Sequence, residues 1–481
     1  MLEDEKRFLS SKKVLVMGLG RFGGGVDAAE FACRAGAKVV VTDLASAQKL
    51  SDSIKKLEKF PDIEFHFGSH DPADFENADV VIANPAVPPD NKFLEIVRRH
   101  NKLVTSQINI FFQLCPAPII GVTGANGKST TTALTAHLLK NTSHELRITR
   151  HGQVWMSGNI GDQPLLTVLD QIKPDDLVVL EISSFQLEQL AQIQKAPKVS
   201  LLTNLLPNHL DRYGTFAAYC AAKENIFKFQ RPDRISPAVS IFNAEDKIGM
   251  EWFEKYKNDA GRICIKFSAD DVSREIRACF PLPGRANLSN LAGALAVARH
   301  FGVDDSRITQ CLPKFEALPH RLELVGRIRG VHWYNDSKAT TPESAIVAIE
   351  AFEQPRIIIA GGYDKDLPFE QLGEKIAKNA KAAILIGRTA QKIASAIHNA
   401  DMSLRGAERR SNLNKRTMNY APRTTRVEIV NSLAEAVQVA DRLAVSGDVV
   451  LLSPACASYD MFENFQHRGQ EFCRLVQGLR A

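Results

Sequence analysis

Short apolar runs alternate with glycine-rich turns and helix-like segments from the start of the chain. An apolar run over residues 13–18 precedes a glycine turn and a helix-like run over residues 27–36, and a second apolar run occupies residues 37–43. Strand, helix and strand within about 30 residues predict a βαβ unit with a parallel sheet. A further strand is predicted over residues 78–83, and a proline-rich stretch then indicates a boundary.

The same alternation recurs twice further along the chain. Apolar runs that predict strands lie at residues 119–123, 177–182, 199–203, 356–360, 382–386 and 448–452. A helix is predicted over residues 130–140, and the apolar run 291–298 is typical of a buried helix. Residues 313–319 favour a second linker. We therefore predict an α/β chain of three domains, each a mostly parallel sheet with flanking helices, at residues 1–115, 116–318 and 319–481.

Composition agrees with a folded chain of this size. Among the 481 residues, 44% are hydrophobic and 24% are charged, which excludes disorder as the main state. The longest apolar runs are far shorter than the roughly 20 residues that span a bilayer, so no membrane span is predicted. The charged N-terminus does not read as a signal peptide. The eight cysteines form no CxxC pair, which fits a reduced, cytoplasmic protein without structural zinc.

Basic charge is concentrated in one segment. The net charge is +5, and residues 405–426 hold seven basic side chains against the single acid Glu408, so the rest of the chain is close to neutral. This distribution argues against a nucleic-acid-binding surface. We interpret the segment as an exposed loop, with a basic docking site as the alternative.

The first glycine turn has the GxGxxG spacing. Gly18, Gly20 and Gly23 follow a predicted strand and precede a helix, and Asp43 ends the next strand. Glycines at these positions let the backbone approach a diphosphate at a helix N-terminus, and the acid can hold ribose hydroxyls. The pattern does not distinguish a dinucleotide cofactor from another nucleoside diphosphate, and a tight turn that binds nothing remains the alternative.

The second glycine turn is the more specific motif. Residues 123–130 read TGANGKST between a predicted strand and a predicted helix. Backbone N–H groups of such a loop cradle phosphates, Lys128 neutralises the β and γ charge, and Ser129 can ligate Mg²⁺. Val122 stands where the strict GxxxxGK[ST] spacing requires glycine, so the loop is a shorter variant. The middle domain is therefore predicted to be P-loop ATPase-like, between two Rossmann-like domains.

Other polar residues at strand ends are weaker signals. Glu181 ends a predicted strand, where open α/β sheets bind ligands, and is either a second metal ligand or a surface acid. A lone histidine such as His209 is more often structural than a ligand, and Lys223 by composition is a solvated helix lysine. Residues 335–343 and 453–469 offer hydroxyls at what would be helix N-termini, which suits a carboxylate or phosphate ligand or a simple capped turn.

Taken together, the motifs resemble the Mur ligase family through nearly the whole chain. Besides the two glycine turns, the resemblance rests on residues 158–161, 181–188, 209–213, 221–223, 287–290, 319–323, 335–340, 361–365 and 453–469. The stretches 181–188 and 453–469 look specific to the members that add D-glutamate. The resemblance implies an ATP- and Mg²⁺-dependent amide ligase of peptidoglycan precursor synthesis. ATP would phosphorylate the carboxylate of UDP-N-acetylmuramoyl-L-alanine, and the amine of D-glutamate would attack the acyl phosphate.

The resemblance also implies a role for individual residues. Catalytic roles fall on Lys128, Glu181, His209, Lys223 and Lys338, and Mg²⁺ would be held by Ser129, Glu181, His209 and Lys223, the last as a carbamylated lysine. ATP would contact Gly124, Ala125, Asn126, Gly127, Lys128, Ser129, Thr130, Asn287, Asn290, Arg321 and Asp336. The UDP substrate would contact Gly20, Arg21, Phe22, Asp43 and Asn159. D-glutamate would contact Thr340, Lys365, Ser458, Tyr459 and Phe465.

Other interpretations are open at this point. Within the fold, a sister ligase that adds a different amino acid, or a folylpolyglutamate synthase, would differ in the third domain. An NAD(P)-linked oxidoreductase would explain Gly18 to Gly23 and Asp43 but not the second glycine turn. A non-catalytic nucleotide-binding regulator would not need metal ligands. The expected partners are the small-molecule substrates alone, without nucleic acid, and the expected state is a monomer.

Overall fold

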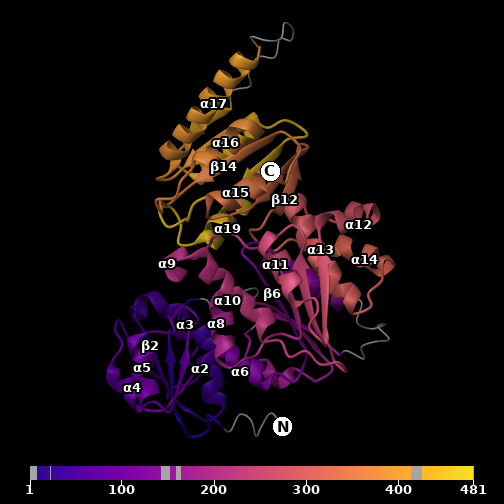
Figure 1. Cartoon of the computed structure of the whole chain (residues 1–481). Coiled ribbons are helices and arrows are strands. Elements are labelled where there is room, and N and C mark those ends of the chain that lie inside the picture. Colours follow the sequence, from indigo (N-terminus) through magenta and orange to yellow (C-terminus); the bar gives the residue numbers. More distant parts are fainter. Residues whose placement is uncertain (1–7, 22, 142–151, 159–163, 413–424, 480–481) are drawn as a thin grey trace. The chain divides into compact units, whose positions relative to one another are not determined.

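The computed structural model describes residues 8–21, 23–141, 152–158, 164–412 and 425–479, with the side chains of 405–412 outside the description. The chain divides into two compact units. The first comprises Met1–Cys279 and Ser289–Pro313, and the second comprises Phe280–Leu288 and Lys314–Ala481. Strands of the described residues form three sheets, as the sequence predicts (Figure 1). The domain boundaries near residues 115 and 318 stay predictions.

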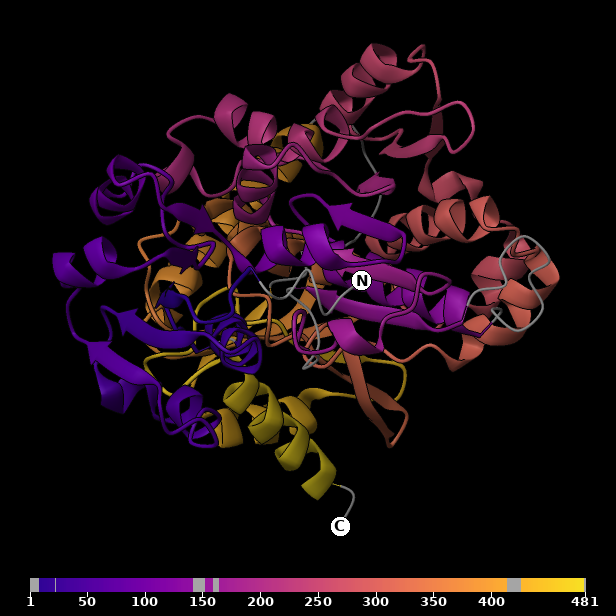
Figure 2. The ribbon, with the colours of Figure 1, turned by 90° about the horizontal axis from the view of Figure 1, so that it is seen from below.

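The first sheet has the strand order β3-β2-β1-β4-β5, and all its pairs are parallel. Its strands are β1 (Lys13–Met17), β2 (Lys38–Asp43), β3 (Glu64–Phe67), β4 (Val80–Ala83) and β5 (Leu103–Thr105). Its helices are α2 (Gly24–Arg34), α3 (Ser51–Lys55), α4 (Pro72–Asn77), α5 (Lys92–Arg99) and α6 (Gln107–Leu114). Helices lie on both sides of the sheet (Figures 1 and 2), which is why central strands such as β4 are apolar at every position.

The second sheet has the order β11-β10-β9-β6-β8-β7 and is also parallel. Its strands are β6 (Ile119–Thr123), β7 (Val154–Gly158), β8 (Leu177–Glu181), β9 (Val199–Leu202), β10 (Ala238–Asn243) and β11 (Arg262–Phe267). The helices are α7 (Lys128–Lys140), α8 (Ser184–Gln192), α9 (Leu210–Tyr213), α10 (Phe216–Lys228), α11 (Lys247–Tyr256), α12 (Arg274–Cys279), α13 (Arg285–His300) and α14 (Asp305–Cys311). The carboxyl ends of β6, β8 and β9 lie side by side, so residues that follow these strands meet at one sheet edge.

The third sheet lies in the second unit and has the order β12-β13-β17-β14-β15-β16. Only the pair β12–β13 is antiparallel among these described strands. The strands are β12 (Glu323–Ile328), β13 (Val331–Asn335), β14 (Arg356–Gly361), β15 (Ala380–Ile386), β16 (Arg426–Ile429) and β17 (Val449–Leu452). The helices are α15 (Pro342–Glu350), α16 (Glu370–Asn379), α17 (Ala390–Asn412), α18 (Leu433–Leu443) and α19 (Phe465–Gly478).

The prediction of a loop over the whole basic segment 405–426 is wrong at both ends. Helix α17 continues to Asn412, and it is the long orange helix beside α16 in Figure 1. Strand β16 begins at Arg426. A run of basic charge does not end a helix by itself, and this stretch of α17 contains no proline and many residues of good helix propensity.

Among the described residues, no helix is both long enough and apolar enough to cross a membrane.

Candidate active site

The loop between β6 and α7 has, at two points, a backbone conformation that strongly favours glycine. Gly124 has φ +149° and Gly127 has φ +80°. A Cβ at Gly124 would lie 1.9 Å from Thr203 Oγ1, and one at Gly127 would lie 2.1 Å from Asn290 Oδ1. Close packing around these two glycines fixes the loop, so the glycine spacing found in the sequence has a steric cause here.

Asn204, two residues after the end of the neighbouring strand β9, holds this loop by hydrogen bonds. Its backbone oxygen accepts from Ala125 N (2.7 Å), and its side-chain oxygen accepts from Asn126 N (3.0 Å). Two of the amides that the motif offers for phosphate binding are therefore engaged within the protein. We therefore expect a phosphate to meet chiefly the amides that open α7, where the helix dipole also favours negative charge.

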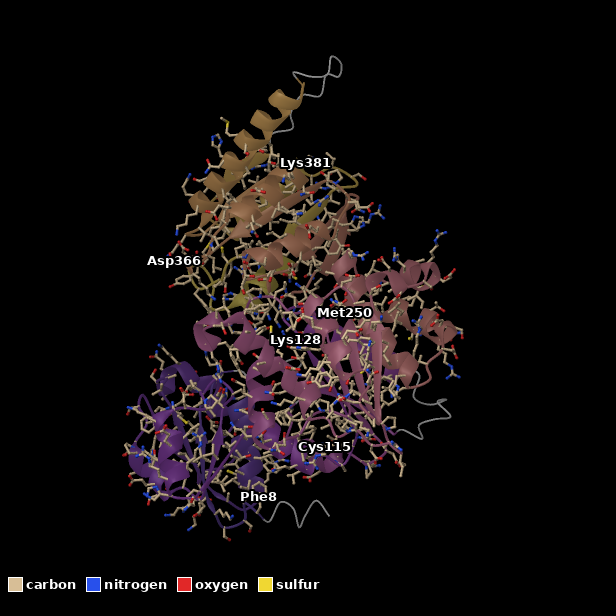
Figure 3. The ribbon with its side chains drawn as sticks, viewed as in Figure 1. Phe8, Cys115, Lys128, Met250, Asp366 and Lys381 are labelled. Carbon is tan, nitrogen blue, oxygen red and sulfur yellow. The ribbon has the colours of Figure 1, made fainter. Side chains whose placement is uncertain are left out.

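Lys128 is folded over the loop that precedes it. Its Nζ donates to the carbonyl oxygens of Gly124 (3.0 Å) and Ala125 (2.8 Å), and it is labelled in Figure 3. This position puts a cation at the start of α7, above the helix N-terminus. A cation above a helix N-terminus suits a polyanion, and the phosphate-binding role of Lys128 stays a prediction.

Ser129 and Glu181 form a buried pair beside this lysine. Ser129 Oγ donates to Glu181 Oε2 across 2.6 Å, and the two residues are 2% and 5% exposed. The pairing of β6 with β8 sets Val122 opposite Glu181, which brings the carboxylate to the loop. The alternative that Glu181 is a surface acid is excluded, because its side chain is buried at the end of β8.

Lys223 contradicts the composition-based interpretation of a solvated lysine. It lies on α10 with 1% exposure, and its Nζ donates to Thr123 Oγ1 across 3.2 Å. Burial lowers the pKa of Lys223 well below its usual range, and the charge of Lys128 lowers it further, while Glu181 opposes the shift. This amine therefore has a much larger neutral fraction than an ordinary lysine.

His209 lies next to these groups and is partly exposed. Its ring centroid is 4.9 Å from that of Phe185, and its backbone is left-handed with φ +53°. Partial burial lowers the pKa of His209, and the charges of Lys223 and Lys128 add to that shift, whereas Asp211 opposes it. The structure thus brings Lys128, Glu181, His209 and Lys223 into one charged site.

These residues fit a magnesium ion that is completed by phosphates. Within the described ranges, no three His, Cys, Asp or Glu side chains gather as a self-sufficient metal cluster. Mg²⁺ in phosphoryl-transfer sites is typically bound through one or two carboxylates plus substrate phosphates. The hydroxyl of Ser129 and the carboxylate of Glu181 supply such a partial set, and His209 supplies a nitrogen.

The first glycine turn is organised by Asp43. Asp43 Oδ2 accepts from Gly20 N (3.0 Å), Asp43 Oδ1 accepts from Ala45 N (2.8 Å), and Ser53 Oγ donates to Gly20 O (2.7 Å). Oδ2 holds the glycine turn and Oδ1 holds the backbone that follows β2, so a contact of Asp43 with ribose would use their remaining lone pairs. Arg21 is exposed beside the turn.

Two of the predicted substrate contacts, Phe22 and Asn159, lie outside the described residues.

The predicted ATP contacts lie in both units. In the first unit, Asn290 accepts from Thr131 Oγ1 across 3.4 Å beside the loop glycines. Asn287, which belongs to the second unit, donates from its Nδ2 to Pro283 O across 2.8 Å. In the second unit, Asp336 is buried and accepts from Leu322 N (3.2 Å) and Ser453 Oγ (2.9 Å).

The predicted D-glutamate residues gather on loops that follow the strands of the third sheet. Gly361 N donates to Pro454 O (2.8 Å), and Tyr363 N donates to Ala457 O (2.9 Å), which joins the loops after β14 and β17. Phe465 begins α19, and its ring lies 5.5 Å from Lys338 Nζ. The remaining members of the predicted pocket lie on these loops and on the loop after β13, namely Thr340, Lys365, Ser458 and Tyr459.

Arg468 connects two of these loops from inside the unit. Its side chain, 1% exposed, donates to Ser337 O (2.9 Å), Ser337 Oγ (3.0 Å) and Cys456 O (3.1 Å). The sequence marks residues 453–469 as polar but does not single out this arginine. A buried cation that bonds only to neutral oxygens is recognisable from contacts and not from spacing.

The buried carboxyl group of Asp336 is expected to make the free energy of unfolding depend on pH. Burial raises its pKa from 3.8 to about 7, against the opposing effects of Ser453, Leu322 and Arg321. Because the folded form binds the proton more tightly than the unfolded chain, wild-type stability falls as pH rises from about 4 to 7, by at most about 1.4 kcal/mol per unit, and then levels off.

Asp336→Asn should remove this dependence because the amide does not ionise. Urea unfolding at pH 5 and at pH 8 is expected to show the variant gaining stability relative to wild type at the higher pH. A difference between variant and wild type that stays constant across this window would contradict the buried carboxylic acid.

The fold and the site define the class of the protein. A phosphate-binding loop, a lysine above a helix N-terminus and a buried serine–glutamate pair at parallel strand ends are the parts of a nucleotide-dependent phosphoryl-transfer enzyme. An NAD(P)-linked oxidoreductase is therefore not the simplest interpretation, because its chemistry does not require the site at the second glycine turn.

Family profiles match the chain in three consecutive segments. Residues 12–106 match the Mur ligase MurD-like N-terminal domain, residues 122–298 the Mur ligase middle domain, and residues 320–456 the Mur ligase glutamate ligase domain.

Curated relatives extend the similarity over the whole length. A protein of Roseiflexus sp. (strain RS-1) named UDP-N-acetylmuramoylalanine--D-glutamate ligase is 38% identical over 498 residues, covering 98% of this chain and 99% of that relative. Proteins of the same name from Clostridium tetani and Acetivibrio thermocellus are 34% identical over 98% and 100% of this chain. The chain belongs to the Mur ligase family.

Solved structures agree in fold. A ligase from Acinetobacter baumannii described as UDP-N-acetylmuramoylalanyl-D-glutamyl-2,6-diaminopimelate--D-alanyl-D-alanyl ligase aligns with TM-score 0.56 at 13% identity, over 99% of this chain and 98% of that one. A pseudomurein peptide ligase type C from Methanothermus fervidus aligns with TM-score 0.51 at 15% identity, over 98% of this chain and 100% of that one.

Proposed function

We propose that this chain is an ATP-dependent ligase that adds D-glutamate to UDP-N-acetylmuramoyl-L-alanine in peptidoglycan precursor synthesis. The observation that carries the phosphoryl-transfer chemistry is the buried Ser129–Glu181 pair beside Lys128 at the end of β6. The full-length relatives named for this reaction support the choice of substrates. The cytoplasmic location and the monomeric state remain predictions.

Amide formation from a carboxylate requires activation, because a carboxylate is a poor electrophile. Transfer of the γ-phosphoryl group of ATP to the alanyl carboxylate gives an acyl phosphate and ADP. The amine of D-glutamate then attacks the carbonyl carbon, and phosphate leaves from the tetrahedral intermediate. Phosphoryl transfer between two anions is assisted chiefly by positioning and positive charge, which Lys128 would supply at the loop.

Magnesium is part of this proposal. Ser129, Glu181 and His209 would hold it, and it would neutralise charge on the phosphates. The chain's own contribution is to fix Glu181 through the Ser129 hydroxyl and to keep the amides at the start of α7 directed at the phosphates.

Carbamylation of Lys223 is proposed on the same site. The buried amine beside Lys128 is held toward its neutral, nucleophilic form. Its nitrogen would bond to the carbon of CO₂ and lose one proton, giving an anionic carbamate. The conversion replaces an amine, whose protonated form would repel Mg²⁺, with an anionic oxygen donor that can help to hold the metal.

The substrates would be held at separate sheet edges. The first glycine turn with Gly20, Arg21 and Asp43 would bind the UDP moiety, so this Rossmann-like turn would serve a substrate and not a redox cofactor. The loops of the third sheet with Thr340, Lys365, Ser458, Tyr459 and Phe465 would bind D-glutamate.

Phosphate release tests the function directly. The chain is incubated with ATP, Mg²⁺ and UDP-N-acetylmuramoyl-L-alanine, and each candidate amino acid is added in turn. Release that depends on D-glutamate, and not on L-glutamate, is the expected result. Release that requires another amino acid would retain the ligase chemistry and refute the third-domain pocket. Absence of release with all amino acids, or turnover of a reduced nicotinamide, would refute the proposal.

A further inference from the structure

Arg212 joins three segments that lie far apart in the sequence. It sits on α9, the single-turn helix that starts directly after His209. Its Nη2 donates to Glu188 Oε2 (3.1 Å) on α8, and its Nη1 donates to the carbonyl oxygens of Pro85 (3.1 Å) and Ala86 (3.2 Å) in the turn after β4. The side chain is only 15% exposed.

The turn after β4 supports the first glycine turn. Asn84 Nδ2 donates to Gly18 O across 3.3 Å, and Ala86 N donates to Asn84 Oδ1 across 3.0 Å. A Cβ at Gly18 would lie 2.9 Å from Asn84 Cβ, so the two turns are in close contact. The carbonyl groups that Arg212 binds therefore belong to the segment that positions the predicted UDP site.

The other side of Arg212 faces the predicted metal site. Its guanidinium carbon lies 4.1 Å from the centroid of the Phe185 ring, and the same ring lies 4.9 Å from that of His209. Phe185 and Glu188 are on α8, which begins three residues after Glu181. The Phe185 ring of α8 thus contacts both the guanidinium of Arg212 and the ring of His209.

The backbone at His209 needs such support. A non-glycine residue at φ +53° is strained and persists only where its surroundings fix it. An isolated helix of four residues has no stability of its own. The bonds of Arg212 to Glu188, Pro85 and Ala86 therefore hold the short helix that orients His209.

We infer that Arg212 is a positioning residue that couples the UDP-binding turn to the metal-site histidine of the same unit. The inference rests on the proposed function for the identity of the two sites. Lysine cannot replace the arginine, because one ammonium cannot bond a carboxylate and two carbonyl groups on different segments while stacking on an aromatic ring.

The experiment compares Arg212→Ala, Arg212→Lys, His209→Ala and the double variant with both alanines. The control is Lys195→Ala, which removes a bond from Lys195 Nζ to Phe112 O (2.9 Å) away from both sites. Four quantities are measured: kcat, the KM for UDP-N-acetylmuramoyl-L-alanine, the Mg²⁺ concentration for half-maximal rate, and the affinity for this substrate by calorimetry without ATP or Mg²⁺. Thermal unfolding is recorded for every variant.

Loss of a charge-assisted hydrogen-bond network should lower kcat and weaken substrate affinity, each by roughly tenfold or more, in Arg212→Ala. Arg212→Lys should recover less than half of this loss on a logarithmic scale. The Mg²⁺ concentration for half-maximal rate should rise in Arg212→Ala. The double variant should have the same kcat as His209→Ala, because a residue that acts through another gives non-additive losses. Lys195→Ala should match wild type.

Three results would overturn the inference. They are additive losses of kcat in the double variant, wild-type behaviour of Arg212→Lys, and unchanged substrate affinity in calorimetry. If Arg212→Ala does not fold, the same measurements on Arg212→Lys, with a wild-type unfolding temperature, decide whether the inference holds. A wild-type chain that does not use D-glutamate would refute the proposed function instead, and the calorimetric affinities would still test the coupling.

Discussion

Replacing Lys128 with alanine is expected to abolish ligation, with a loss of about 10³-fold or more in the rate of phosphate release. The Lys128 ammonium lies over the loop on the carbonyl oxygens of Gly124 and Ala125, where it faces the N-terminus of α7. The Ala125 and Asn126 amides are engaged by Asn204, so we expect the lysine to carry a large share of the charge that would stabilise the transferring phosphoryl group. Phosphate release with ATP, both substrates and Mg²⁺ measures the effect.

The matched control is Lys140→Ala at the other end of the same helix. Lys140 is exposed and lies in the last turn of α7, so its removal should leave the rate close to wild type. Arginine at position 128 should not restore activity, because its planar fork does not fit the space that two carbonyl groups leave for a compact ammonium. Substantial turnover by Lys128→Ala would refute the assignment of the phosphate loop.

Most of the fold follows from apolar periodicity. Strands buried on both faces read as continuous apolar runs, and β1, β4, β6, β8 and β17 all lie within segments that the sequence predicts as strands. Strand β3 alternates exposed and half-buried positions at a sheet edge, and β5 has only three residues, so neither has a strong pattern.

The site could be predicted in part because its backbone requirements are visible in the sequence. A side chain at Gly124 or Gly127 would clash with neighbouring atoms, so glycine is required at both positions. Lys128 and Ser129 follow Gly127 directly and are found from the same motif. Lys223 shows the limit of this approach, because a lysine on a helix is normally solvated and only the packing of α10 reveals its burial. The resemblance to a known family, and not composition, identified it beforehand.

Residues that act by connecting segments were not found from the sequence. Asn204, Arg212 and Arg468 bond to backbone oxygens or amides of loops that lie 78 to 131 residues away. No local spacing encodes such contacts, since they depend on which strands become neighbours in the sheet. Arg212 and Asn204 follow β9, whose pairing with β6 only the structure reveals.

Replacing Lys223 with alanine is expected to lower the ligation rate by about a hundredfold or more, and a small carboxylic acid in the buffer should restore part of it. The buried side chain occupies a space next to Thr123 Oγ1, and its truncation leaves room for a carboxylate where the carbamate would lie. Lys223→Arg should be inactive and not rescued, because a guanidinium neither reacts with CO₂ nor leaves that space.

Two comparisons make this test specific. Lys228→Ala changes an exposed lysine on the same helix and should show neither a loss nor an effect of the added acid. Removal of CO₂ from the buffer should slow the wild-type enzyme and leave Lys223→Ala unchanged, and the carbamate carbon should be detectable by NMR with ¹³C-labelled CO₂. Unchanged activity in Lys223→Ala would refute the carbamate. A response to both CO₂ and an added carboxylate would separate a carbamate from a lysine that only fills space, because a space-filling side chain responds to neither.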